Sequence, residues 1–209
     1  MIRQLRTIAS DSKSTMSRSR APFALAALAA LLTMPLPIAS PAIAAPAREA
    51  RIRYPAGHYP VLALPGGQRQ EIKSLLNVAR PLWFGGYVWN DAGVPPGPAW
   101  IRIDLARQLL SVFRGGHEIG TAVILYGTDG KPTPSGLFAI LERAKEHRSN
   151  LYDAEMPYML RLTRDGVAIH ASNVGAGSAT HGCIGIPIAF ARRLFDQMKV
   201  GDQVAIVRT

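Results

Sequence analysis

From Trp100 onward the chain consists of short apolar runs separated by glycine-rich and proline-rich turns, and this pattern constrains the fold more than any other feature. Ile101, Ile103 and Leu105 alternate with polar partners, and a second run over 109–113 follows after a short break. Alternation with a period of two is typical of a strand that buries one face, and two such runs in succession indicate a β-hairpin. A long helical bundle is therefore excluded.

The rest of this half predicts more strands and one clear helix. Short apolar runs predict strands over 119–126, 137–141, 158–162, 167–169 and 204–207, with a loop over 127–136. Pro187 suits the first turn of a helix whose apolar stripe is Ile188, Ala191, Leu194, Phe195 and Met198, and Gly201 should end it. Apolar residues at helical spacing predict another short helix over 68–79. The expected class is mainly β with a few short helices.

The N-terminus is expected to be an export signal. Residues 1–20 carry five basic residues and one acidic residue, and residues 21–34 are apolar and uncharged. Ala42-Ile43-Ala44 has the small-x-small pattern that signal peptidase cleaves, so we expect a signal peptide over 1–44 and a periplasmic or cell-envelope location. The alternative is an uncleaved membrane anchor, but the apolar stretch is shorter than the ~20 residues that span a bilayer.

The charge of the remaining chain does not indicate a nucleic-acid partner. Without residues 1–44 the formal net charge falls from +10 to +6, with 19 basic and 13 acidic residues that are scattered along the sequence. The five histidines show no HExxH or CxxC spacing, so no metal site and no cofactor are expected. No later segment reaches the length of a membrane span.

Cys183 is the only cysteine of the chain, so it cannot form an intramolecular disulfide. A buried, inert thiol is one interpretation. The surrounding sequence, Thr180-His181-Gly182-Cys183-Ile184-Gly185, favours another, because small flexible residues and an imidazole give the sulfur access and a base. His170, at the end of a predicted strand, and His181 are both candidates for the base of a Cys/His dyad.

Residues 45–97 precede the regular alternation. The Pro, Ala and Gly content of 45–66 predicts an extended lead-in without packed elements, and residues 92–98 predict a turn or linker. An aromatic group at Trp83, Phe84, Tyr87 and Trp89 offers a surface on which carbohydrate could stack, but aromatic residues at this density more often belong to a core. We therefore expect core packing here.

The segment around the cysteine, IHASNVGAGSATHGCIG (169–185), resembles the signature of the L,D-transpeptidase catalytic domain (YkuD-like) family. WIRIDLARQLLSVFRGGHEIG is similar to the family's opening hairpin, KPTPSGLFAI to its Thr-Pro-x-Gly turn, MPYMLRLTRDGVAIH to the segment that enters the catalytic histidine, and GDQVAIV to its closing strand. The resemblance covers 98–208, implies an L,D-transpeptidase-like β-sandwich or barrel for that domain, and leaves 45–97 as an extension of unassigned role.

The resemblance also implies roles for individual residues. Cys183 matches the acyl-accepting nucleophile, His170 its general base, and the backbone carbonyl of Ala171 the third member of the site. His181 and Gly182 match positions that shape the nucleophile loop, whose backbone N–H groups at Gly182 and Cys183 are the implied oxyanion donors.

Other matched positions concern the substrate. Met156 and Tyr158 match the wall of the substrate groove, and Thr180 keeps the hydroxyl of the usual serine. Gly185 stands where the family has an arginine, which affects substrate choice more than reaction type. Arg192 or Arg193 could replace it, although a solvated charge is the commoner role for an arginine on a helix.

The implied activity is that of an exported L,D-transpeptidase acting on peptidoglycan stem peptides through a thioester, without metal or other cofactor. Two alternatives stay open at this point. The same site could serve an L,D-carboxypeptidase, an endopeptidase or a lipoprotein-attaching enzyme, or the domain could be a catalytically silent wall-binding module. The sequence does not determine the acceptor amine or the oligomeric state.

Overall fold

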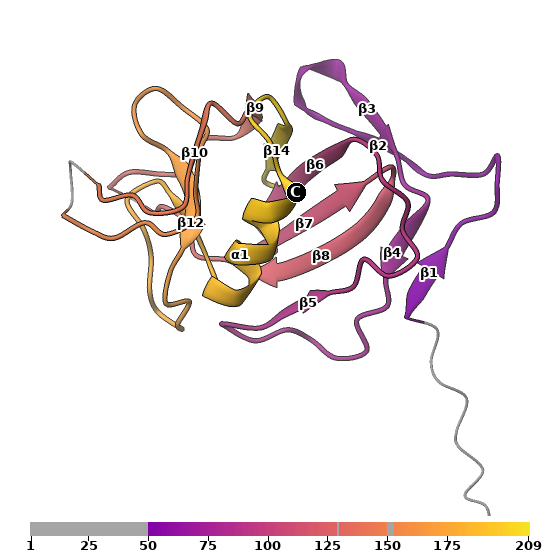
Figure 1. The fold of residues 1–209 in the computed structure, drawn as a ribbon, viewed down its shortest axis with the longest axis horizontal. Coiled ribbons are helices and arrows are strands. Elements are labelled where there is room, and N and C mark those ends of the chain that lie inside the picture. Colours follow the sequence, from indigo (N-terminus) through magenta and orange to yellow (C-terminus); the bar gives the residue numbers. More distant parts are fainter. Residues whose placement is uncertain (1–49, 129, 150–152) are drawn as a thin grey trace, which may run out of the picture. The chain divides into compact units, whose positions relative to one another are not determined.

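The computed structural model describes residues 50–128, 130–149 and 153–209, and the predicted signal peptide lies outside them. The larger sheet contains the predicted hairpin, extended to three antiparallel strands, β6 (Ala99–Asp104), β7 (Leu109–Arg114) and β8 (His117–Val123) (Figure 1). The other strands of this sheet are β1 (Arg51–Arg53), β4 (Ser74–Leu76), β5 (Tyr87–Trp89), β9 (Gly136–Ala139) and β14 (Gln203–Val207). Strand β14 runs parallel to β6 and antiparallel to β9.

A second sheet lies beside the larger one. It has the order β10 (Glu142–Ala144), β11 (Met159–Arg161), β12 (Ala168–Ala171) and β13 (Ile184–Ile186). Strands β12 and β13 are parallel, and an isolated bridge between Leu125 and Gly185 connects β13 to the end of the β8 segment. The observed fold is mainly β, as the sequence predicts.

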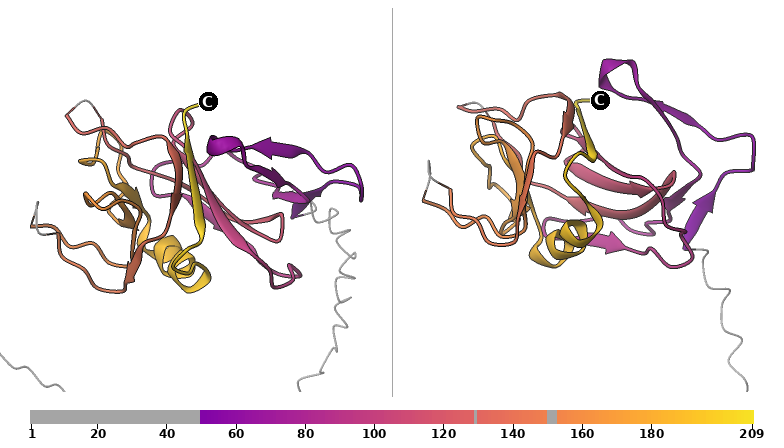
Figure 2. Two further views of the ribbon diagram at one scale, coloured as in Figure 1. Left: turned by 90° about the horizontal axis from the view of Figure 1, so that it is seen from above. Right: turned by 45° about the horizontal axis from the view of Figure 1, so that its top comes forward.

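The helix α1 (Ile188–Gln197) packs against β12 and lies where the two sheets meet, as Figures 1 and 2 show. Its Phe190 ring is fully buried and meets Tyr87 and Trp89 edge to face, with ring centroids 5.7 and 5.4 Å away. Ile188, which the predicted stripe includes, is instead 60% exposed. The main core combines residues of both sheets with the inward face of α1.

The helix expected over 68–79 is not present, and this prediction was wrong. The segment forms β3 (Arg69–Glu71) and β4. Ile72, which lies between these strands, and Ser74 and Leu76 of β4 are buried, while their neighbours are more exposed. That alternation is the period of a strand, and β4 pairs with β1 on one side and β8 on the other. These neighbouring strands form the hydrogen bonds with the backbone N–H and C=O groups that a short helix would form within itself.

The lead-in over 45–66 also packs more closely than expected. Strand β2 (Val61–Ala63) pairs with β3, a 3₁₀ turn covers Pro65–Gly67, and Leu64 is buried. In β1 the Arg51 side chain is 3% exposed and donates hydrogen bonds to the carbonyls of Glu118 and Asn90. From Arg51 onward the extension is therefore part of the folded structure.

The aromatic group divides between core and surface. Tyr87 and Trp89 pack on the main core, as expected, whereas Trp83 is 81% and Phe84 40% exposed, contrary to expectation. A tight turn, in which the Gly86 N–H donates to the Trp83 carbonyl at 2.7 Å, directs these two rings away from the core. Within the described ranges, no helix is long and apolar enough to cross a bilayer.

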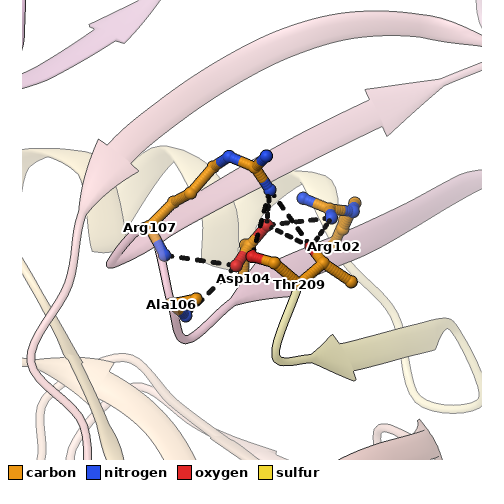
Figure 3. A network of polar contacts seen from close by, with 5 residues as sticks. All are labelled: Arg102, Asp104, Ala106, Arg107 and Thr209. Carbon is orange, nitrogen blue, oxygen red and sulfur yellow. Dashed lines mark hydrogen bonds and ion pairs between the residues drawn. The ribbon is translucent and has the colours of Figure 1, made fainter.

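A buried carboxylate joins the end of β6 to the end of the chain (Figure 3). Asp104 accepts hydrogen bonds from the backbone N–H groups of Ala106 and Arg107 and from the hydroxyl of Thr209. The guanidinium groups of Arg102 and Arg107 lie 2.9 and 2.6 Å from its second oxygen. Asp104 thereby links the β6–β7 turn to Thr209, which follows β14.

Candidate active site

A cavity of about 420 Å³ opens beside the second sheet. Five of the residues singled out in the sequence line it: Met156, His170, Thr180, His181 and Cys183. Tyr158 does not line it, because its ring packs against Phe195 of α1 at 5.8 Å between centroids. The structure thus brings most of the predicted site together and places Tyr158 outside the cavity.

The parallel pairing of β12 and β13 brings the cysteine and the first histidine to the same cavity. His170 lies in β12 opposite Gly185 of β13, and Cys183 immediately precedes β13. The two residues are 13 positions apart in the sequence, and residues 172–183, which include Cys183, lie between the two strands. The Cys183 thiol is half-buried, and its sulfur lies 3.6 Å from the carbonyl oxygen of Gly166.

The carbonyl of Ala171 orients the imidazole of His170. Nδ1 of His170 lies 2.8 Å from the Ala171 oxygen, and since a carbonyl only accepts, Nδ1 carries the proton. Nε2 is then the unprotonated nitrogen of the neutral ring and is able to accept a proton. The hydrogen bond thus selects the tautomer that a general base needs.

Both ionisable groups favour their neutral forms. Burial lowers the pKa of His170, although its hydrogen bond to Ala171 opposes this effect. Burial raises the pKa of the Cys183 thiol, and the charge of Asp165 raises it further. A backbone hydrogen bond at Ala168 and the charge of Lys131 act in the opposite direction and lower it. Both pKa shifts therefore favour a neutral thiol and a neutral imidazole at this cavity.

The loop that carries Cys183 is held by a special backbone conformation at Gly182 and by a close backbone contact at Gly127. Gly182 has a φ of +102°, a region that favours glycine. A Cβ on Gly127 would lie 2.4 Å from the Gly182 nitrogen, so the two backbones cross in direct contact. On the other side of Cys183, the Thr180 hydroxyl donates to the Cys183 carbonyl.

A buried threonine that sequence reasoning did not single out also holds this loop. Thr133, 4% exposed, donates its hydroxyl proton to the Gly182 carbonyl at 2.9 Å. In the sequence, Thr133 stands out only as a member of the segment KPTPSGLFAI. That segment does not indicate which residue the Thr133 hydroxyl would bind.

The position of Gly185 explains why it carries no side chain. Gly185 is buried in β13, and a Cβ there would lie 2.8 Å from the Ser172 Cβ. Arg192 and Arg193 are exposed on α1 and do not line the cavity, so neither replaces the family arginine there. The basic side chains at the cavity are instead those of Lys131, Arg161 and Arg164, together with His147, His170 and His181.

No metal centre is present in the described part of the chain, since nowhere in it do three His, Cys, Asp or Glu residues gather in a way that could hold an ion. The chemistry available to this cavity is that of a thiol, an oriented imidazole and backbone N–H groups. Such a set suits nucleophilic acyl transfer.

Comparison with known proteins identifies the family of this domain. The family model of the L,D-transpeptidase catalytic domain (YkuD) matches residues 98–206. L,D-transpeptidase 2 of Mycobacterium tuberculosis is 25% identical over 119 residues, which cover 49% of this chain and 29% of that protein.

Two solved structures share the fold. The L,D-transpeptidase (Yku) from Stackebrandtia nassauensis has a TM-score of 0.50 and 22% identity, over 54% of this chain and 57% of that one. The LD transpeptidase LdtMt1 in complex with imipenem has a TM-score of 0.50 and 23% identity, over 52% and 58%. This chain therefore spans less than two thirds of the length of each of these relatives. Since the family model matches more than half of the chain, the protein belongs to the L,D-transpeptidase catalytic domain family.

Proposed function

We propose that the protein is an exported L,D-transpeptidase that acts on peptidoglycan stem peptides, with Cys183 as nucleophile and His170 as general base. The observation that carries this proposal is the hydrogen bond from His170 Nδ1 to the Ala171 carbonyl, at the cavity that the Cys183 thiol also lines. It leaves Nε2 ready to take the thiol proton. Family membership supports the same reaction class.

The first half-reaction forms a thioester. The Cys183 proton passes to Nε2 of His170 while the sulfur attacks the carbonyl carbon that precedes the terminal D-residue of the stem. Backbone N–H groups at Gly182 and Cys183 stabilise the negative charge on the carbonyl oxygen. The carbon–nitrogen bond then breaks, and the leaving amine takes the proton from the imidazolium.

The second half-reaction reverses these proton transfers. An acceptor amine attacks the thioester, gives a proton to His170, and releases the sulfur, which regains its proton. Cys183 and His170 are both neutral at the start of the cycle, and the two half-reactions return each of them to the neutral form. Covalent catalysis thus divides one difficult substitution into two easier ones.

The proposal includes an arrangement of the chain. Residues 1–44 form a signal peptide cleaved after Ala44, residues 45–97 are an extension, and residues 98–208 form the catalytic domain of a periplasmic or cell-envelope enzyme. Met156 and Thr180 contact the substrate, since both line the cavity. His181 shapes the nucleophile loop without acting as the base.

The decisive experiment incubates the purified protein with a disaccharide tetrapeptide and identifies the products by mass. A cross-linked dimer supports the transpeptidase, a tripeptide alone indicates a carboxypeptidase, and unchanged substrate indicates a silent wall-binding module. A carbapenem should add one adduct to the wild type and none to Cys183→Ala. An adduct on Cys183→Ala would contradict the assignment of the nucleophile.

Two histidine variants separate the general base from the loop. His170→Ala should lower turnover about 100-fold to 10,000-fold, the usual contribution of general-base catalysis. His181→Ala is the matched control and should keep measurable activity, because His181 is outside the proposed proton path. A dead His181→Ala beside a nearly normal His170→Ala would reverse the two roles.

A further inference from the structure

Thr133 lies outside the catalytic cavity but is hydrogen-bonded to the loop that carries the cysteine. Its hydroxyl donates to the Gly182 carbonyl at 2.9 Å and accepts from the Gly127 N–H at 2.9 Å. The Thr133 N–H donates in turn to the Gly127 carbonyl at 3.4 Å. The side chain is 4% exposed, so water does not compete for these bonds.

The carbonyl that Thr133 holds belongs to the same peptide unit as the N–H of Cys183. A peptide unit is planar and, in its trans form, its carbonyl and its N–H point in opposite directions. Holding the Gly182 oxygen toward Thr133 therefore directs the Cys183 N–H away from Thr133. Since Gly182 has a φ of +102° and little intrinsic preference for one orientation, the peptide plane needs such an external contact.

We infer that Thr133 is a positioning residue that aims the Cys183 N–H at the developing oxyanion of the acyl-transfer reaction. The inference rests on the proposed function, in which this N–H is an oxyanion donor. Donors that are oriented before the reaction stabilise the transition state most, because no reorganisation is needed when charge develops.

The neighbouring contacts make this orientation rigid. The backbones of Gly127 and Gly182 touch, and both residues are hydrogen-bonded to the Thr133 hydroxyl, so the three residues hold one another in place. The Thr180 hydroxyl donates to the Cys183 carbonyl, which fixes the next peptide plane. Two threonine hydroxyls thus hold the planes on both sides of the nucleophile, and only Thr133 does so from outside the cavity.

The test separates the nucleophile from the oxyanion donor. Alkylation of Cys183 by iodoacetamide needs the sulfur but no oxyanion donor, whereas acyl transfer needs both. Thr133→Val keeps the shape of the side chain and removes the hydroxyl. It should leave the alkylation rate within about 3-fold of wild type and slow acyl transfer about 10-fold to 100-fold, somewhat less than the loss of an entire oxyanion donor.

Two further variants serve as controls. Thr133→Ser keeps the hydroxyl and should restore acyl transfer to near the wild-type rate. Thr121→Val makes the same change at a threonine that is 5% exposed and lies in β8 outside this cavity, and should alter neither rate. Equal losses of alkylation and acyl transfer in Thr133→Val would show a general disturbance of the loop and overturn the inference, as would unchanged acyl transfer.

Two acyl donors distinguish this inference from the proposed function. The stem tetrapeptide reports the proposed activity, and p-nitrophenyl acetate reports acylation of Cys183 without peptidoglycan recognition. If the wild type reacts only with the ester, the assignment of a peptidoglycan substrate fails. The effect of Thr133→Val on acylation by the ester then still tests whether the Cys183 N–H acts as an oxyanion donor. If wild type accepts neither donor while alkylation proceeds, both proposals fail.

Discussion

Replacing Gly185 with alanine should destabilise the protein, even though the family carries an arginine at this position. The added Cβ would lie 2.8 Å from the Cβ of Ser172, 3.2 Å from its Oγ and 3.4 Å from the Cβ of Leu125. The first separation is shorter than packed carbon atoms accept, so β12 and β13 must move apart. Because His170 lies opposite Gly185 in that pairing, the movement also displaces the proposed base.

The expected loss is the difference between two effects. Overfilling a packed interior typically costs about 1 to 3 kcal/mol. The backbone of Gly185 lies outside the left-handed region, so alanine also restricts the unfolded chain and contributes about 0.4 to 1 kcal/mol of stability. The net loss should be roughly 0.5 to 2 kcal/mol in the free energy of unfolding. An arginine would meet the same atoms with its first carbon.

A double-mutant cycle identifies the clash. Ser172→Gly removes the two nearest atoms and leaves Leu125 at 3.4 Å, an ordinary contact. In the Ser172→Gly background only the gain of about 0.4 to 1 kcal/mol from the restricted unfolded chain should remain, so the coupling should equal the clash cost of about 1 to 3 kcal/mol. Urea unfolding of wild type, both single variants and the double variant measures this coupling. An equal loss in both backgrounds would refute the packing explanation.

Two further predictions concern ionisation. The charge of Asp165 raises the pKa of the Cys183 thiol and the charge of Lys131 lowers it. Asp165→Asn should therefore move the pH profile of Cys183 alkylation to lower pH, and Lys131→Met should move it to higher pH. Shifts of both variants in the same direction would contradict this electrostatic account. Burial alone would raise the pKa of Asp104, but hydrogen bonds from Arg107, Thr209 and Arg102 outweigh it and hold the pKa below its usual value. A carboxyl with a lowered pKa stabilises the fold above its unfolded pKa of about 3.9, and this stability is lost as the pH falls toward the folded pKa. Asp104→Asn should therefore lower stability by about 1.5 to 3 kcal/mol at pH 7 and by less at pH 3, as measured by thermal unfolding; the same difference at both pH values would exclude a contribution from the charge.

Several elements could be predicted from the sequence because their signals are local. The hairpin of β6 and β7 follows from alternating residues on both sides of a short break, and α1 follows from its apolar stripe and from Pro187. The unpaired Cys183 and its two neighbouring histidines are likewise visible in a short segment. Such patterns depend on residues a few positions apart, which the geometry of one strand or one helix relates directly.

The segment 68–79 shows where local signals fail. Its apolar residues fit a helical spacing, but Ile72, Ser74 and Leu76 also fit the alternation of a strand. The choice depends on β1 and β8, which offer strand edges from elsewhere in the chain. The exposure of Trp83 could not be predicted either, because the composition of a turn does not determine which of its side chains point toward the core.

The sequence by itself determined the mainly β class, the positions of the strongest strands and the helix, and the residue types from which a thiol-dependent site could be built. Only the tertiary structure decided that β12 and β13 pair in parallel, so that His170 and Cys183 share a cavity, and that Thr133 reaches Gly182 across 49 residues. The physical reason is that strand register and buried hydrogen bonds depend on partners distant in sequence, which are chosen when the whole core packs together.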